Sequence, residues 1–518
     1  MKSFILLLLT FSSIWIRAQA DLGTSPLMRI EIPVQSDQET FRVIPCSQRG
    51  FLLFYKSVEM VDETRIKWIF VFYTPDFKQS WIKSVPIDGD HDLIVTSWQG
   101  SDTLSFLFSY TGKSKEEAGD MNIIRLIFPS ATFIVNSFHI PGAVQPCAMY
   151  TRNSYGVIGL NVKDNVAQLA WIDLASGKTR IFPSGPGNMT RIVELKAHIT
   201  DPGIITILSK QVNRKVEEFY LVVFDTSGHT VIDTRISSID PQRILSSVKC
   251  VQSNKDSIAI LGTYRIDGTG SKSHSDDTGE IAGLYYTLFA KANQVDFSFI
   301  PLMDLKNIGL LMSEKDILNI KKKALKKSEG QSELTLGFYF LLHDIISSHD
   351  GYLFLADIYF PQYHTEYFTD FDYYGRPYSN TYSVFDGYRF TNALAVALNN
   401  QGRMQWDQVM EIRNLLSFEL KPKMNILLKH DTLLMCYLGD GKIGSKLFLR
   451  DKLLGKLEYD PVELSHPEDK LISESRSYMA YWYNDYFLCF GYQEIKNIAL
   501  GQNNKRKVFF INKMEFWH

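Results

Sequence analysis

Residues 392–412 read NALAVALNNQGRMQWDQVMEI, and this stretch shows the pattern from which most of the chain is built. The apolar run from Leu394 to Leu398 is followed by a four-residue turn that ends in Gly402, and then by a segment that carries Trp406. Glycine supplies the positive φ that tight hairpins need, so the stretch predicts two antiparallel strands joined by a turn. Weaker forms of the same pattern return about eight times along the sequence.

Each repeat is marked most clearly by a short apolar strand. The eight strands of this kind lie at residues 51–55, 104–108, 157–160, 204–208, 258–261, 352–355, 433–436 and 487–490. Each is followed by a longer strand, and usually by a turn and a closing strand. A repeat is therefore a four-stranded antiparallel unit of roughly 45–50 residues once insertions are set aside. Such a unit cannot bury both of its faces alone, so the units must stack against one another.

Four-stranded sheets repeated radially make a β-propeller, which typically has about 4–8 blades. The strand, glycine turn and Trp-bearing strand from Leu394 to Trp406 resemble the third and fourth strands of blades in quinoprotein-like and WD40-like propellers. The sequence from Tyr359 onward also resembles uncharacterised exported bacterial propeller proteins, which implies no particular activity. We predict an all-β, eight-bladed β-propeller of four-stranded antiparallel blades, with seven blades as the alternative should one weak unit fail to form.

The last repeat is expected to borrow its closing strand from the other end of the chain. Its third strand is predicted at residues 507–511, and little sequence follows for a fourth. Residues 28–34, MRIEIPV, resemble the closing strand of the first repeat at residues 80–86, SWIKSVP. We therefore predict that residues 28–34 complete the last blade, which would remove an open sheet edge.

Residues 1–20 are predicted to be a secretory signal peptide. Met1-Lys2 precedes an apolar run from Phe4 to Ile16, and Ala18-Gln19-Ala20 has the small-x-small form of a cleavage site. The residue directly after this site is Asp21 and not a cysteine, so no lipid anchor is predicted. No later apolar run reaches about 18 residues, so no membrane-spanning segment is predicted. Residues 21–518 are expected to form a single propeller domain in a bacterial periplasm or outside the cell.

Composition supports a globular, exported protein. The 55 Lys and Arg residues nearly balance the 57 Asp and Glu residues, giving a net charge of -2, which provides no argument for a nucleic-acid partner. The five cysteines are an odd number and are spread thinly, unlike the dense pattern of disulfide-rich domains. We predict that they are buried small apolar residues.

Three long insertions interrupt the repeats, and all fall in loop types that emerge on one face of a propeller. They lie at residues 265–280, 302–332 and 361–390. The second is predicted to contain one short helix that starts at Ser313, with five lysines near its C-terminal end. Those lysines fit either an anionic contact surface or a solvated helix that complements its own dipole.

The third insertion is rich in aromatic residues. Our candidate binding residues, all within it, are Tyr363, Tyr367, Phe368, Tyr373, Tyr374, Arg376, Tyr378 and Tyr382. Aromatic side chains with one polar end suit protein interfaces, and flat rings suit sugar faces. The alternative is that the insertion folds over the scaffold and buries most of its rings in a small local core.

Recognisable catalytic chemistry is absent from the sequence. We find no H-E-x-x-H, G-x-S-x-G or correctly spaced phosphate-binding loop, and we predict no catalytic residue, metal or cofactor. We favour a non-enzymatic scaffold whose insertion-bearing face binds another exported or cell-envelope protein. A glycan- or peptide-binding module, and a hydrolase or lyase with dispersed catalytic residues, remain the alternatives. Carboxylates and histidines that line the central channel would favour the enzyme, and an exposed apolar patch on the insertions would favour the binder.

Overall fold

The computed structural model describes most of the chain. The described ranges are residues 28–35, 40–98, 102–112, 119–142, 144–152, 154–163, 166–198, 203–213, 216–254, 256–266, 281–311, 339–348, 350–371, 373–450, 452–455, 457–497 and 504–516. The predicted signal peptide at residues 1–20 and the helix predicted from Ser313 lie outside these ranges, as does most of the first insertion.

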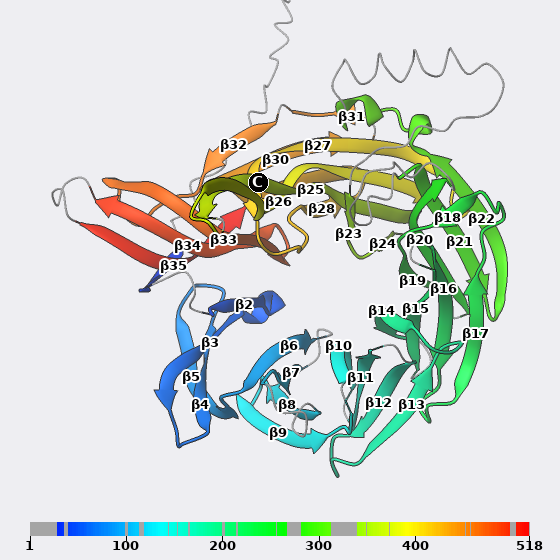
Figure 1. Ribbon diagram of the computed structural model, residues 1–518, viewed down its shortest axis with the longest axis horizontal. Helices are drawn as coiled ribbons and strands as arrows, with labels where there is room; N and C mark the ends of the chain where they lie inside the picture. The colour runs from blue at the N-terminus through cyan, green and yellow to red at the C-terminus, as the bar shows by residue number, and fades with distance from the viewer. Residues whose placement is uncertain are drawn as a thin grey trace, which may run out of the picture.

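The described residues form eight antiparallel sheets that follow one another around a ring in chain order (Figure 1). Blade 1 contains β2 (Arg42–Pro45), β3 (Phe51–Met60), β4 (Arg65–Tyr73) and β5 (Gln79–Asp88). Blade 2 contains β6 (His91–Ser97), β7 (Thr103–Tyr110), β8 (Asp120–Ile127) and β9 (Thr132–His139). Blade 3 contains β10 (Val144–Arg152), β11 (Tyr155–Val162), β12 (Ala167–Asp173) and β13 (Thr179–Ser184). Blade 4 contains β14 (Thr190–Ala197), β15 (Ile204–Asn213), β16 (Val216–Phe224) and β17 (Thr230–Ile236).

Blades 5 to 7 each have one strand that is split in two. Blade 5 contains β18 (Arg243–Leu245) and β19 (Lys249–Asn254), both paired with β20 (Ser257–Ile266), then β21 (Gly283–Ala290) and β22 (Asn293–Pro301). Blade 6 contains β23 (Tyr339–Leu342) and β24 (Ile346–Ser348), both paired with β25 (Gly351–Phe371), then β26 (Pro377–Asn399) and β27 (Met404–Ser417). Blade 7 contains β28 (Asn425–Lys429), β29 (Thr432–Gly439) and β30 (Lys442–Leu449), which pairs with β31 (Lys452–Leu453) and β32 (Glu458–Pro461). Three short 3-10 helices are η1 (Ser47–Arg49), η2 (Leu302–Asp304) and η3 (Ile308–Leu311).

Burial explains why these segments form strands at these places. In blade 2 the central strand β7 is buried over residues 104–109, because neighbouring blades cover both of its faces. The outer strand β9 alternates between exposed and half-buried residues, as expected for a strand with one face in water. Eight hydrophobic cores lie between successive blades, including one between blades 8 and 1. The prediction of an eight-bladed, all-β propeller is confirmed.

The N-terminal strand closes the ring. Blade 8 contains β33 (Asp469–Tyr483), β34 (Tyr486–Asn497) and β35 (Lys505–Glu515), and its fourth strand is β1 (Arg29–Pro33). β1 lies antiparallel to β35, with Arg29 opposite Asn512 and Pro33 opposite Val508. Blade 8 also packs onto blade 1, where the indole Nε1 of Trp482 donates to the carbonyl of Gly50 at 2.8 Å.

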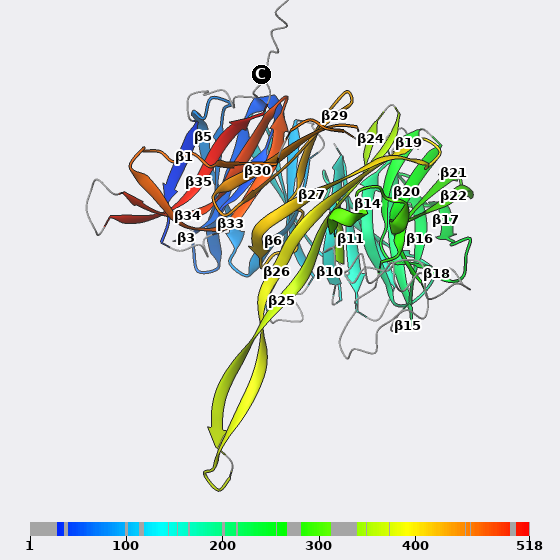
Figure 2. The same cartoon turned by 90° about the horizontal axis from the view of Figure 1, so that it is seen from above.

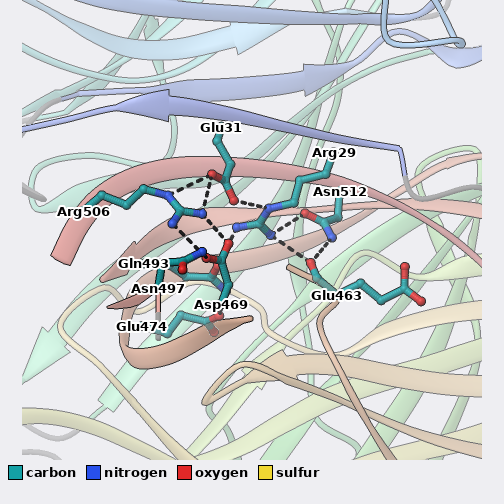
Figure 3. A network of polar contacts seen from close by, with 9 residues as sticks. All are labelled: Arg29, Glu31, Glu463, Asp469, Glu474, Gln493, Asn497, Arg506 and Asn512. Atoms are coloured by element: carbon teal, nitrogen blue, oxygen red, sulfur yellow. Dashed lines mark hydrogen bonds and ion pairs between the residues drawn. The ribbon is translucent and has the colours of Figure 1, made fainter. Parts of the chain in front are cut away.

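A polar network joins β1 to the other strands of blade 8 (Figure 3). The Arg29 guanidinium, whose side chain is 1% exposed, donates to Glu31 at 2.8 Å, to Asn512 at 2.8 Å and to Gln493 at 2.8 Å. Arg506 bridges Glu31 and Asp469, which lie on different strands of the blade. Burial lowers the pKa of Arg29, and the hydrogen bond from Arg506 is the main cause that lowers the pKa of Asp469. The network therefore joins residues more than 400 positions apart in the chain.

The stretch at residues 392–412 forms the outer half of blade 6. Trp406, in β27, packs against the core between blades 6 and 7. The next residue, Asp407, is 1% exposed, and its two carboxylate oxygens accept the backbone N–H groups of Lys306 and Asn307 at 2.8 Å each. Both residues therefore have structural roles.

We expect replacement of Gly402 by alanine to destabilise the propeller more than the equivalent change in another blade. Gly402 has φ +68°, and a Cβ there would lie 2.0 Å from the Tyr286 ring. Gly177, in the corresponding turn of blade 3, has φ +71° and open space around its Cβ position. The left-handed backbone costs about 1–2 kcal/mol in both variants. Overpacking adds about 1–3 kcal/mol only in Gly402→Ala, as denaturant unfolding would measure. Equal losses in the two variants would contradict the importance of the Tyr286 contact.

The cysteines follow the prediction with one exception. All five cysteines are free. Cys46, Cys250, Cys436 and Cys489 are buried, whereas Cys147 is exposed. The prediction was wrong for Cys147, which lies at the surface where β10 bulges between Pro146 and Ala148. Among the described residues, no helix has the length and apolar character needed to cross a membrane.

Candidate functional site

The third insertion forms a long two-stranded ribbon rather than a loop. β25 and β26 continue to pair far beyond the point where their neighbours end, from Tyr359 opposite Phe390 to Phe371 opposite Pro377. β23 stops pairing with β25 at Tyr359, and β27 stops pairing with β26 at Tyr388. We call residues 361–387 the arm. At roughly 3.3 Å per residue, its eleven-residue first strand reaches about 36 Å, and Figure 2 shows it projecting well away from the ring.

The arm exposes its aromatic residues. Tyr367 is 77% exposed, Tyr373 is 96% exposed and Tyr374 is 80% exposed. Tyr363, Phe368, Tyr378 and Tyr382 are also exposed. The alternative that this insertion folds over the scaffold and buries its rings is therefore wrong, because a two-stranded ribbon has no third layer against which to bury them.

The candidate residues do not converge on one point. Because opposed residues of paired strands share a face, the register divides the arm into two faces and a tip. Phe368, Tyr378 and Tyr382 lie on one face, Tyr363 and Tyr367 lie on the other, and Tyr373, Tyr374 and Arg376 lie at the tip.

One face, which we call the acidic face, carries hydrogen bonds between its own side chains. His364 Nδ1 lies 2.5 Å from Asp386, and its Nε2 lies 3.2 Å from Glu366. The Tyr382 hydroxyl donates to Glu366 at 2.5 Å, and the Tyr378 hydroxyl donates to Asp370 at 3.2 Å. These hydrogen bonds lower the pKa of Glu366, with the bond from Tyr382 as the largest cause. The carboxylates of this face are thus already engaged within the arm.

We expect His364 to titrate above the ordinary histidine value. Hydrogen bonds to Asp386, and then to Glu366, raise its pKa from 6.5. A raised pKa in the folded arm means that protonation stabilises the arm fully below about pH 6.5, and that this contribution is lost as the pH rises through the raised value. Proton NMR of the imidazole ring would measure the midpoint. Asp386→Asn should bring it back toward 6.5, whereas Asp431→Asn, on blade 7, should leave it unchanged; a wild-type midpoint at or below 6.5 would refute the network.

The opposite face, which we call the hydroxyl face, carries aromatic rings in a row. Along β25, Tyr363, Tyr367 and Phe371 alternate with threonines. Across from them, β26 presents short side chains, namely Pro377, Ser379, Thr381 and Ser383, followed by Phe385. The rings therefore recur along a hydroxyl-bearing face at intervals of four residues, or about 13 Å.

Aromatic contacts hold the base of the arm to the propeller. The Phe385 ring lies 5.4 Å from that of Tyr363 and 5.0 Å from that of Tyr388. Tyr388 contacts Tyr359 at 5.5 Å, and Phe385 approaches Phe418 at 6.4 Å. Beyond these contacts both outer edges of the ribbon lack a partner strand among the described residues.

A second feature, which sequence analysis missed, is a cavity of about 300 Å³ at the same face of the propeller. It lies among blades 1, 2 and 8 and the link between blades 6 and 7, and its polar lining includes Arg42, Glu419, Lys421, Arg476 and Tyr478. These residues come from segments that are far apart in the sequence, so no local motif could have indicated them.

The inner strands of blades 4 to 6 carry charges that are paired with one another. Lys196 lies 2.8 Å from Glu194, and Lys249 lies 3.0 Å from Asp344. Glu194 also accepts the backbone N–H of Cys250 at 2.7 Å. This arrangement ties three blades together. Within the described ranges, no group of three or more His, Cys, Asp or Glu side chains could hold a metal ion.

The His343 side chain is similarly engaged in the structure. Its Nε2 lies 3.0 Å from Asp357, which is fully buried. Asp357 accepts the backbone N–H groups of Lys423 at 2.5 Å and Met424 at 3.3 Å. The pair therefore anchors the link between blades 6 and 7.

Comparisons with known proteins show likenesses of fold. No protein-family model and no curated protein matches the chain. Polysaccharide lyase Uly1 superposes with a TM-score of 0.41 and 6% identity, over 94% of this chain and 99% of its own. The β-propeller domain of the Trilobed protease from Pyrococcus furiosus gives 0.33 and 9% identity, over 83% and 98%. A post-proline cleaving enzyme from Rickettsia typhi gives 0.35 and 12% identity, over 87% of this chain and 57% of the enzyme.

Proposed function

We propose that this chain is an exported, non-enzymatic binding protein whose arm contacts another exported or cell-envelope protein. The observation that carries the proposal is the row of exposed rings on a ribbon that pairs with no other described strand beyond its base. Isolated two-stranded hairpins are marginally stable in water, and exposed apolar patches on soluble proteins commonly mark interaction sites. A partner that covers the arm would bury these rings and stabilise the ribbon.

The hydroxyl face fits an extended polypeptide segment. Tyr363, Tyr367 and Phe371 span about 26 Å along one line, which exceeds the width of a single sugar ring. Neighbouring rings are about 13 Å apart, too far to stack on both sides of one sugar. The open edges of β25 and β26 add unpaired backbone groups that an extended strand can engage by β-augmentation. We therefore favour a protein partner over the glycan alternative.

Site-specific photo-cross-linking in the native cell envelope would test the proposal. A benzophenone amino acid in place of Tyr367 is expected to form a covalent adduct with one partner protein, which mass spectrometry identifies. The same amino acid in place of Val295, which is 56% exposed on the outer strand of blade 5, is the matched control and should not capture that partner.

The captured partner would then be purified and its Kd measured. Tyr367→Ser is expected to weaken binding about tenfold or more, because buried aromatic anchors at interfaces contribute about 2 kcal/mol or more. Adducts with a second copy of this chain alone, equal capture from Val295, or an unchanged Kd would each contradict a protein-binding arm. Binding of a glycan that is lost in Tyr367→Ser would favour the alternative.

A further inference from the structure

The cavity on the arm side of the propeller has a polar rim and an apolar floor. Phe54 from blade 1 and Phe490 and Phe509 from blade 8 contribute rings to the floor, and Leu93 comes from blade 2. Volumes of about 300 Å³ lie at the lower end of those found for small-molecule sites, which are mostly apolar with a few convergent polar groups. The cavity therefore has the size and character of a site for one small molecule.

Among the described residues that line the cavity, three side chains are cationic and one is a carboxylate. Lys421 lies 2.5 Å from Glu419, so these two charges offset one another. Glu419 also accepts the Tyr478 hydroxyl at 2.8 Å. Arg42 and Arg476 add two guanidinium groups to the lining, from the neighbouring inner strands β2 and β33, and Arg42 has no carboxylate partner within the described ranges. Both arginines line the cavity together with Tyr478.

Arg476 has a left-handed backbone conformation and lies at a β-bulge. It has φ +46° at a register shift between Ser475 and Tyr478, where β33 bulges against β34. Gly491 permits this bulge, because a Cβ at that position would lie 2.7 Å from the Cα of Ser477. Bulges and left-handed non-glycine residues re-aim side chains and are concentrated at functional sites. The bulge therefore shapes the backbone from which Arg476 lines the cavity.

Lys423 adds a positive charge next to Tyr478. Its ammonium lies 4.1 Å from the centre of the ring of Tyr478, the residue whose hydroxyl donates to Glu419. The Lys423 side chain is 5% exposed, and burial lowers its pKa to about 8. Tyr478, which lines the cavity, therefore has a buried cation next to its ring, and this charge favours an anion nearby.

We propose that this cavity binds a small organic carboxylate whose apolar body rests on the phenylalanine floor. The carboxylate accepts hydrogen bonds from Arg42 and Arg476, since planar guanidinium groups recognise carboxylates in this way. The apolar body replaces water over the rings of Phe54, Phe490 and Phe509. This site is distinct from the arm, so neither the proposed carboxylate nor its test depends on the partner protein.

Isothermal titration calorimetry of the full chain would test this site. Phenylacetate and hexanoate are expected to bind, and their neutral amides, phenylacetamide and hexanamide, should bind at least tenfold more weakly. Arg42→Gln and Arg476→Gln should each raise the Kd of the acids about tenfold or more, because a hydrogen bond to a charged group contributes about 1.5–3 kcal/mol. Arg403→Gln removes the same charge from an exposed turn of blade 6 and should leave the Kd unchanged.

Several results would overturn the proposal. These are the absence of binding by either acid, equal binding of acids and amides, and a Kd that is unaffected by both arginine substitutions. Acetate or inorganic phosphate binding as tightly as phenylacetate would show an anion site that ignores the apolar floor. Melting curves confirm that each variant is folded, and Arg42→Gln carries the test should Arg476→Gln disturb the bulge, because Arg42 is exposed on regular strand backbone.

Discussion

Deleting residues 21–35 is expected to lower the melting temperature of the protein by about 5 °C or more. The deletion removes β1, its pairing with β35, and the contacts of Ile30 and Ile32 in the core between blades 8 and 1. Two packed isoleucines and the hydrogen bonds of a short strand together contribute about 5 kcal/mol. For a chain of this length the entropy of unfolding is about 1 kcal/mol per K, which converts that loss into roughly 5 °C.

Calorimetry would measure this change against a control that removes only residues 21–27 and so keeps Met28, whose carbonyl accepts a hydrogen bond from Lys513. The control should melt like the parent. A further variant, Arg29→Met, keeps the strand but removes the guanidinium at the centre of the network in Figure 3, and it should fall between the two. An unchanged melting temperature after deletion of β1 would mean that closure of the ring does not stabilise it.

Replacing residues 364–384 by Asn-Gly is expected to abolish partner binding while leaving the melting temperature unchanged. The replacement joins Tyr363 directly to its opposed residue Phe385 by a two-residue hairpin turn, for which Asn-Gly is strongly preferred. The aromatic contacts at the base of the arm are kept, including that between Phe385 and Tyr388. All of the exposed rings beyond Tyr363 are lost, and with them most of the proposed contact surface.

The matched control simplifies one face of the arm without shortening the ribbon. Phe368→Thr with Tyr382→Thr alters the acidic face alone, so it should retain binding if the partner uses the hydroxyl face. Co-purification and Kd would be compared for the parent, the shortened arm and this double variant. Full binding by the shortened arm would refute the proposed function, and loss of binding by the double variant would move the contact to the acidic face.

The fold could be predicted because it is encoded locally and repeatedly. Runs such as Leu394 to Leu398 carry the strand signal, and the similarity of residues 28–34 to residues 80–86 identified the closing strand. Both signals depend on which residue types suit a buried or half-buried strand, and that information is present in a few consecutive positions.

The projecting hairpin of the arm was harder to predict, although the sequence contains the pattern of a hairpin. At every second position from 363 to 371, an aromatic residue alternates with threonine. Gly375 then lies in the turn before a second strand-forming run. That pattern favours a hairpin, but it does not decide whether the hairpin folds back or projects. The outcome depends on where β23 and β27 stop pairing, which is a property of the whole blade.

The cavity could not be predicted at all. Arg42 and Arg476 are brought together only because closure of the ring places blade 8 beside blade 1, and Arg476 lies at a bulge made by one extra residue in β33. No local sequence pattern indicates either cause, so a site of this kind can be recognised only in the three-dimensional structure of the closed ring.

The sharing of blade 8 between the two ends of the chain also has a kinetic consequence. Arg29 and Asn512 are 483 residues apart, and bringing such distant segments together costs about 5 kcal/mol of loop-closure entropy if the chain between them is disordered. That cost falls when the intervening blades have already stacked and hold the ends near one another. We therefore expect pairing of β1 with β35 to be a late event in folding. Until then both strands present unpaired edges, which makes the period between synthesis and closure the time of greatest risk of aggregation.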